Sequence, residues 1–270
     1  MPRHRHRHRH RHRSIGFSRT VSAMTAVGVA TALLMPVTAA HGAVDDTIPA
    51  PRIVGTEQSR SVQRVARPPI RRSFIPFGPT RKRQMAHYSA LHYGEAMWRL
   101  RPRGIVQHFT GTRSLRSVFA TFRSNAPDPE LGQRPGVCTH FVIDRDGTIH
   151  QLVRLSLRCR HTVGLNHRTI GVEHVGLSDR EVMRNPRQRA ASVALSAWLA
   201  ERFGIATGDV IGHNESLRSR FHHELYRPWR CQTHGDFGRA TMNRYRRHLN
   251  ARLAGSAVST APPRWSPTSC

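Results

Sequence analysis

The sequence predicts an α/β fold in which a single domain holds a central mixed β-sheet flanked by helices. Strand-like and helix-like segments alternate between residues 85 and 253. Two apolar runs are separated by Asp144-Arg145-Asp146-Gly147, which is typical of a hairpin turn. Asn185 and Pro186 form a helix start, and Gly204 ends the amphipathic stretch that follows. Strands and helices mixed on this scale indicate a sheet covered by helices.

The individual elements follow from periodicity and from turn residues. The predicted strands are residues 105–106, which end at His108, then 139–143, 148–153, 169–175 and 210–211. The predicted helices are residues 85–100, the segment from Pro186 with Ala191, Leu195, Trp198 and Leu199 on one stripe, and a last helix with Met242, Tyr245, Leu249 and Leu253 on one face.

The first 43 residues are interpreted as a secretory signal peptide. Arg and His alternate over residues 3–13, and no acidic residue precedes Asp45. An apolar run at 23–37 and the small residues 38–40 complete the pattern. An uncleaved membrane anchor is the alternative, although the run is shorter than the roughly twenty residues that span a bilayer. We therefore expect a secreted, extracellular or cell-wall-associated protein.

Three further boundaries follow from composition. Residues 44–84 are rich in Pro and Arg and poor in apolar periodicity, which predicts an extended linker. Residues 85–253 are expected to form the folded domain, and this length suffices for one core. Residues 254–270 are rich in Pro and Ser and are expected to form a flexible tail.

The net charge of +27 predicts attraction to polyanions. Seven of the positive charges are arginines of the leader, so the remainder still carries +20. Nucleic acid and the anionic polymers of a cell wall are both candidates on charge alone. For an exported protein we favour wall polymers and expect no specific nucleic-acid binding. We also expect a monomer.

The chain has four cysteines and no CxxC pair, which argues against a four-thiolate zinc site. In an oxidising compartment these cysteines favour disulfides. Cys138 with Cys159 is the favoured pair, because both flank the predicted hairpin.

Two histidines, His108 and His213, lie at the ends of short apolar strands, where site residues are common in α/β folds. Asp236 could join them as a third zinc ligand, because imidazole and carboxylate both suit zinc. His234 could then stabilise an oxyanion. Each feature also has a plain structural interpretation: ordinary histidines, and an aspartate that caps the last helix.

Glu173 is the fourth candidate. It lies in an otherwise apolar strand, on the face opposite Ile170 and Val172 by alternation. It is either exposed to solvent or placed in a cleft, where it could act as a general base.

The ordered motifs IVQHFTGT, THFVIDRDGTIHQLV, CRHTVGLN, TIGVEHVG, VIGHNES and THGDF, within about residues 103–250, resemble the zinc-dependent N-acetylmuramoyl-L-alanine amidase family. This superfamily includes the peptidoglycan recognition proteins. The resemblance implies a mixed sheet with flanking helices, one catalytic Zn²⁺ ion, and peptidoglycan or muropeptides as the substrate. It further implies hydrolysis of the amide between N-acetylmuramic acid and L-alanine by zinc-activated water.

Position by position, the resemblance implies that His108, His213 and Asp236 bind zinc and that Glu173 is the base. His161 and Asn166 correspond to positions that line the family's substrate cleft. His234 stands where the family usually has lysine. The 23 positions between His213 and Asp236 imply an inserted loop, which leaves Cys231 as an alternative third ligand.

Two other functions compete with the hydrolase. A non-catalytic peptidoglycan-binding module would resemble the enzyme but lack a metal ligand, often the third. A polyanion-binding protein would account for the charge but not for the ordered motifs.

Overall fold

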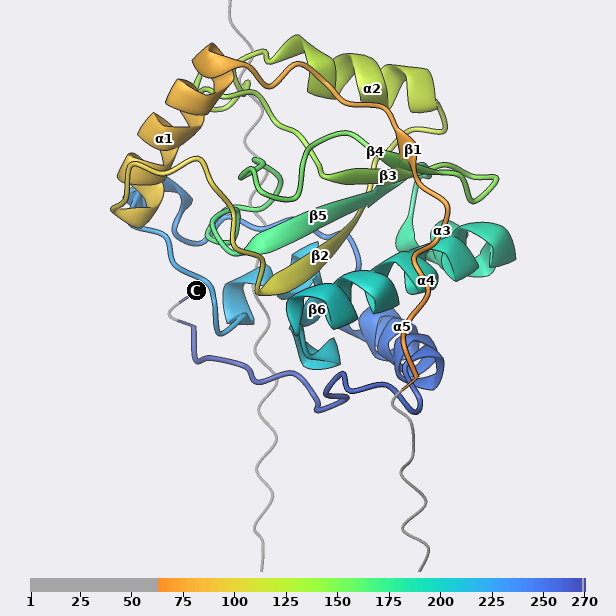
Figure 1. Ribbon diagram of the computed structural model, residues 1–270. Helices are drawn as coiled ribbons and strands as arrows, with labels where there is room; N and C mark the ends of the chain where they lie inside the picture. Colours follow the sequence, from red (N-terminus) through yellow and green to blue (C-terminus); the bar gives the residue numbers. More distant parts are fainter. Residues whose placement is uncertain (1–62, 269) are drawn as a thin grey trace, which may run out of the picture. The chain divides into compact units, whose positions relative to one another are not determined.

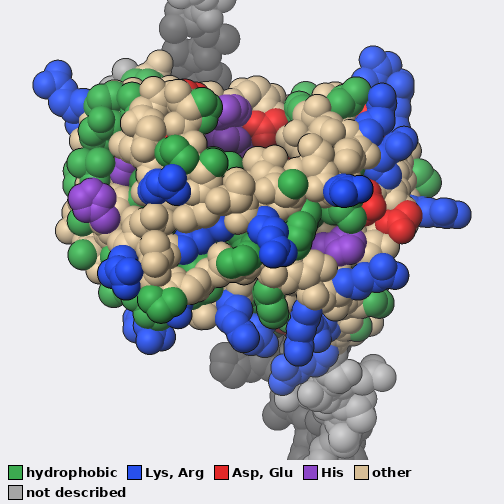
Figure 2. Space-filling view, turned by 90° about the horizontal axis from the view of Figure 1, so that it is seen from above, with side chains coloured by type: hydrophobic (Ala, Val, Ile, Leu, Met, Phe, Trp, Pro, Cys, Tyr) green, Lys and Arg blue, Asp and Glu red, His purple; other side chains and the backbone are tan. Residues whose placement is uncertain are grey.

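The computed structural model describes residues 63–268 and Cys270, which belong to one compact unit. The predicted signal peptide and the first part of the predicted linker lie outside the described residues. Among the residues described, no helix is long and apolar enough to cross a membrane. On the face shown in Figure 2, Lys and Arg side chains are spread widely, whereas Asp and Glu are few.

A single mixed sheet forms the centre of the described unit (Figure 1). Its strands are β1 (Arg71–Arg72), β2 (Gly104–Phe109), β3 (Phe141–Ile143), β4 (Ile149–Gln151), β5 (Thr169–His174) and β6 (Val210–Gly212). Their order across the sheet is β1-β4-β3-β5-β2-β6. The β3–β4 pair is antiparallel and the other pairs are parallel. The predicted α/β class with a mixed sheet is confirmed.

Helices cover both faces of the sheet. They are α1 (Pro79–Tyr93), α2 (Leu115–Ser124), α3 (Asp179–Arg184), α4 (Pro186–Phe203) and α5 (Arg239–Arg252), with short 3-10 segments η1 (Thr207–Asp209), η2 (His213–Arg218) and η3 (Arg227–Trp229). In Figure 1, α3, α4 and α5 gather on one side of the sheet and α1 and α2 on the other. The largest core cluster joins the sheet to α3, α4 and α5, and a second joins it to α2.

Strand alternation decides which side chains reach each layer. Ile170 and Val172 of β5 are fully buried in the core beneath α4 and α5. Glu173 therefore lies on the opposite face, as the alternation predicts. β2 runs parallel to β5 with His108 directly beside Glu173, so both side chains lie on this second face of the sheet.

The predicted start and end of α4 are both confirmed. The side chain of Asn185 accepts hydrogen bonds from the backbone N–H groups of Arg187 and Gln188, and Pro186 occupies the first turn. Gly204 follows the helix with φ 62°, a left-handed conformation that favours glycine.

Other helices differ from the prediction. The helix predicted for residues 85–100 is α1, which runs from Pro79 to Tyr93 and is followed by Gly94, a residue with φ 75°. α2 and α3 were not predicted, although serines at 114 and 178 cap their first turns. α3 has only six residues, too few for a clear periodic signal, whereas the apolar residues 115, 118, 119 and 122 of α2 have helical spacing that could have predicted it.

The predicted linker and tail boundaries are wrong within the described residues. Ile75 is buried against the second core cluster, and the backbone N–H of Val65 donates to Glu201. At the other end, Ser259 accepts a backbone hydrogen bond from Thr207, and Trp265 forms a β-bridge with Ser219. Backbone hydrogen bonds and a few apolar contacts hold both segments, which composition alone does not reveal.

Buried His140 predicts acid-dependent stability. Its Nδ1 accepts from the Gly171 N–H at 3.0 Å, and its Nε2–H donates to the Leu157 carbonyl at 2.9 Å. Burial lowers the pKa of His140 to about 4, against 6.5 in an unfolded chain. The unfolded state therefore binds more protons below pH 6.5, and His140 destabilises the fold as pH falls from 6.5 to 4, by up to about 3 kcal/mol.

Chemical denaturation between pH 4 and pH 7 tests this expectation. His140→Asn keeps an acceptor near the Gly171 N–H but cannot be protonated. Its free energy of unfolding should change less with pH than that of the parent protein. Parallel curves for the two proteins would contradict the assignment.

Candidate active site

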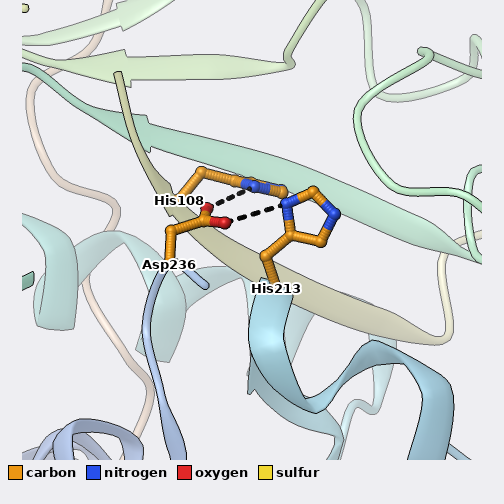
Figure 3. A group of neighbouring side chains, drawn as sticks. All are labelled: His108, His213 and Asp236. Atoms are coloured by element: carbon orange, nitrogen blue, oxygen red, sulfur yellow. Dashed lines mark hydrogen bonds and ion pairs between the residues drawn. The ribbon is translucent and has the colours of Figure 1, made fainter. Parts of the chain in front are cut away.

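Two histidines and an aspartate from distant parts of the chain meet at the edge of the sheet (Figure 3). His108 lies in β2, His213 directly follows β6, and Asp236 precedes α5. Asp236 Oδ2 is 3.1 Å from His108 Nδ1, and Asp236 Oδ1 is 3.2 Å from His213 Nδ1. The structure thus brings together all three predicted ligands, and their role in metal binding stays a prediction.

The three side chains suit a zinc ion. One donor atom from each lies within 4.8 Å of the other two. Donor atoms bound tetrahedrally to zinc at about 2.0–2.1 Å lie roughly 3.3 Å apart, so the observed 3.1 and 3.2 Å separations need little adjustment. Two imidazoles and one carboxylate leave a fourth position for water or substrate, which is typical of catalytic zinc.

A close backbone contact brings Asp236 to His213. A Cβ atom on Gly212 would lie 1.8 Å from the carbonyl oxygen of Phe237. Only glycine therefore permits the segment of Asp236 to pass this close to the end of β6. The backbone N–H of Asn214 donates to the Asp236 carbonyl at 2.9 Å, which secures the same contact.

A buried ion pair fixes the turn that holds His213. The Glu215 carboxylate accepts hydrogen bonds from the Gly212 N–H at 3.2 Å and from Arg246 at 2.9 and 3.0 Å. Arg246 also donates to the Val210 carbonyl at 3.1 Å. Removing one partner of such a buried pair typically costs about 3–5 kcal/mol. The Glu215–Arg246 pair therefore fixes the backbone next to His213 and restricts the position of its side chain.

Burial and pairing give these groups suitable protonation states. Burial lowers the pKa of His108 to about 4, although Asp236 opposes this shift. The imidazole is therefore neutral at pH 7, as a metal ligand must be. Burial alone would raise the pKa of Asp236, but hydrogen bonds from His108 and His213 outweigh it and hold the pKa well below its usual range. Asp236 is consequently ionised.

Glu173 lies beside His108 on the neighbouring strand and lines the same cleft. Its Oε2 atom is buried and has no hydrogen-bond partner among the described residues. Burial and the nearby charge of Asp236 raise the pKa of Glu173 to about 8. A buried carboxyl without a partner is unfavourable for stability, which favours a role in the chemistry of the cleft.

His161, a predicted substrate contact, also contacts a predicted ligand. Its Nδ1 lies 3.2 Å from His108 Nε2 and 2.8 Å from the Thr162 hydroxyl. Gly171 makes room for this ring, because a Cβ atom there would lie 2.7 Å from it. His161 thus supports the orientation of His108, and its contact with substrate stays a prediction.

Asn166, the other predicted substrate contact, is fully buried. Its Oδ1 accepts from the backbone N–H groups of His161 and Thr162, both at 2.7 Å. Its Nδ2 donates to the Tyr93 hydroxyl at 3.1 Å. These bonds give Asn166 the role of holding the loop of His161, and direct contact with substrate stays a prediction.

A cleft of about 710 Å³ opens in front of these residues. The three predicted ligands, Glu173 and His161 all line it. His234 lies exposed at its rim, with its ring stacked on His213 at a centroid distance of 4.7 Å. A cleft of this size is typical of small-ligand sites, and the three predicted ligands form part of its wall.

Two disulfides frame the site. Cys138 and Cys159 are bonded, which confirms the favoured pair. Cys231 is bonded to Cys270, so its sulfur is not a free thiolate. The alternative third ligand is therefore excluded in the oxidised protein, since zinc binds thiolate sulfur.

Arg160, which the sequence did not single out, lines the same cleft. It donates to Asp128 at 2.8 Å and to the carbonyls of Gln133 and Pro135 at 2.9 and 3.0 Å. These bonds hold the loop that forms one wall of the cleft. These partners are distant from Arg160 in the sequence and come close to it only in the folded chain. No local sequence pattern therefore predicts the contacts of Arg160.

Comparisons with known proteins find one family model and several solved structures that are similar to this chain. The family model described as N-acetylmuramoyl-L-alanine amidase matches residues 98–228, which include His108, Glu173 and His213. Among solved structures, the endolysin amidase LysCS from Clostridium intestinale URNW is 20% identical, with a TM-score of 0.45, over 69% of this chain and 98% of that chain.

Two further solved structures are similar to the chain. The amidase LysC from Clostridium intestinale URNW is 19% identical, with a TM-score of 0.44, over 68% of this chain and 98% of that one. An AmpD derivative is 19% identical, with a TM-score of 0.42, over 65% and 93%. No curated protein shows a significant match. The matching family model covers slightly less than half of the chain, and the ordered motifs resemble the same family, the N-acetylmuramoyl-L-alanine amidases.

Proposed function

We propose that this protein is a secreted, zinc-dependent amidase that cleaves the bond between N-acetylmuramic acid and L-alanine. The observation that supports this most strongly is the convergence of His108, His213 and Asp236 on one point of the cleft wall, with Glu173 beside them. His108, His213 and Asp236 would hold the zinc. When bound, zinc supplies Lewis-acid chemistry to water and to the amide carbonyl.

Glu173 is the proposed general base. In its ionised form it takes a proton from water as the water oxygen attacks the lactyl carbonyl carbon. It then gives this proton to the nitrogen of L-alanine as the C–N bond breaks. Asp236 is one cause of the raised pKa of Glu173, so pairing Asp236 with a cation would favour the ionised form.

His234 is proposed to stabilise the oxyanion that forms on the carbonyl. It lies at the cleft rim and stacks on His213, so its ring nitrogens can approach a substrate bound at the three ligands. A hydrogen-bond donor that already points to where negative charge develops lowers the activation barrier, because the protein does not have to rearrange during the reaction. His234 stands where the family usually has lysine, and like lysine it offers a nitrogen that can donate a hydrogen bond.

Export is also part of the proposal. It rests on the pattern of residues 1–43, which lie outside the described residues. Two disulfides support it, because disulfides persist mainly in oxidising compartments. Peptidoglycan is then accessible to the enzyme.

Product analysis tests the proposed reaction. Purified sacculi treated with the zinc-loaded protein should release L-alanine amino termini without new reducing sugar ends. A His213→Ala variant is the metal-deficient control. Binding to sacculi without new amino termini would instead indicate a recognition module, and new reducing ends would indicate a glycosidase.

A further inference from the structure

We infer that a groove along α3, α4 and α5 binds a linear polyanion with repeating phosphate groups. Three cavities of about 440, 510 and 560 Å³ adjoin one another there. The first and second share Arg180 and Arg184, and the second and third share Arg189 and His248. We call this groove the basic track and define it by Arg180, Arg184, Arg189, Arg244, His248 and Arg252.

The basic track is separate from the catalytic cleft. α3, α4 and α5 pack on one face of the sheet, whereas His108 and Glu173 lie on the other. No residue of the track lines the catalytic cleft. A ligand in the track would therefore leave the cleft free for peptidoglycan.

Helix periodicity aligns the arginines and the histidine of the track. Arg244, His248 and Arg252 follow one another at four-residue intervals on α5, so they share one face of that helix. Arg180 and Arg184 have the same spacing on α3. All five side chains are exposed. The two helices pack side by side with α4, which places these rows along a common groove.

The arginines of the track are not neutralised within the described part of the chain. None of them forms a salt bridge with a carboxylate there, whereas Arg113 and Arg246 each do. Asp179 is the one carboxylate lining the central cavity. Arg180 and Arg184 are like charges at four-residue spacing on α3, which slightly destabilises that helix. The stability of the helix therefore does not explain why these arginines lie next to one another. A bound polyanion would reduce the repulsion between their charges.

The shape and chemistry of the track favour an extended phosphate polymer. Guanidinium groups bind phosphate oxygens in a bidentate manner. Because the arginines line three successive cavities, they suit repeated phosphates better than a single anion. The choice of a wall-linked poly(alditol phosphate), rather than nucleic acid, rests on the proposed function, which places the protein at peptidoglycan.

A charge-neutralised variant tests the basic track. Arg184→Gln, Arg244→Gln and Arg252→Gln are combined in the full-length, zinc-loaded protein. Binding is measured on sacculi that carry poly(glycerol phosphate), and on the same sacculi after this polymer has been removed with hydrofluoric acid. The variant should bind the intact sacculi at least tenfold more weakly, with a salt dependence reduced by about one unit of slope per lost phosphate contact.

A matched variant controls for net charge. Arg72→Gln, Arg116→Gln and Arg123→Gln remove three exposed arginines of β1 and α2 that have no salt bridge among the described residues. This control should bind intact sacculi as the parent does. All three proteins should bind the stripped sacculi equally and weakly. Should the triple track variant fold poorly, Arg244→Gln with Arg252→Gln repeats the comparison.

Three results would overturn the inference. Equal loss of binding in the track and control variants would show a general charge effect. Unchanged binding of the track variant to intact sacculi would exclude the groove. Tighter, track-dependent binding to double-stranded DNA than to poly(glycerol phosphate) would identify nucleic acid as the occupant. Amide cleavage of a small soluble muropeptide, measured in parallel, should be equal in all variants, and its absence from every protein would refute the proposed function without touching the binding result.

Discussion

Replacing Glu173 with glutamine is expected to slow amide hydrolysis by about 10²–10⁴-fold, the usual contribution of a general base. The fold should tolerate the change. The Glu173 carboxyl is buried with an unpartnered Oε2, and glutamine has nearly the same shape. The variant should therefore bind zinc normally and unfold at a similar denaturant concentration. Turnover of a muropeptide and zinc content by mass spectrometry measure the two properties separately.

Glu130→Gln is the matched control for this prediction. Glu130 lines the same cleft but is exposed. Its substitution changes the charge of the cleft by the same amount without removing the proposed base. Cleavage should stay within about twofold of the parent rate. If Glu173→Gln retained near-parental turnover, Glu173 would have no part in the reaction.

Replacing Asp236 with alanine should abolish tight zinc binding and, with it, hydrolysis. A structural zinc site contributes about 10–16 kcal/mol from its ligands together, so losing one should cost several kcal/mol, or at least about a hundredfold in affinity. His108 and His213 would lose their shared partner as well. Competition with a chromogenic chelator measures the affinity directly.

The disulfide provides the control for the third ligand. Cys231→Ser combined with Cys270→Ser removes the exposed Cys231–Cys270 bond and leaves the three predicted ligands in place. This variant should retain parental zinc affinity. Retention of zinc by Asp236→Ala, together with its loss from the cysteine variant, would assign the third position to Cys231 instead.

The parts of the fold that sequence predicts well have local signals. The turn at residues 144–147 joins β3 to β4, and Asn185 and Gly204 bound α4 as expected. Alternation along β5 also places Glu173 correctly, because a strand has a period of two residues whatever lies around it.

The first turn of α1 shows why composition misleads. Arg81 lies within the predicted linker, yet it is buried and donates to the carbonyls of Phe122 and Gly136 at 3.0 and 3.1 Å. An arginine with backbone partners that are distant in sequence looks the same as a solvated one when only the sequence is known. Composition therefore underestimates the extent of the folded region.

Some residues of the candidate site can be predicted from local sequence patterns, and others cannot. The positions of His108 and His213 at strand ends are readable from short apolar runs. Asp236 is a candidate by residue type alone, and the family resemblance favours it further. Its approach to the histidines is not readable from the sequence, because it depends on the absence of a Cβ atom at Gly212 beside Phe237. The spacing of the basic track is visible along α5, but its pairing with α3 depends on how the helices pack.

The proposed zinc site is tested most directly by a crystal structure of the zinc-loaded protein, with anomalous diffraction at the zinc edge. We expect one zinc ion bound by His108 Nδ1, His213 Nδ1 and an Asp236 oxygen, each at about 2.0–2.2 Å. Zinc bound at other side chains, or no zinc in the cleft at saturating concentration, would contradict it.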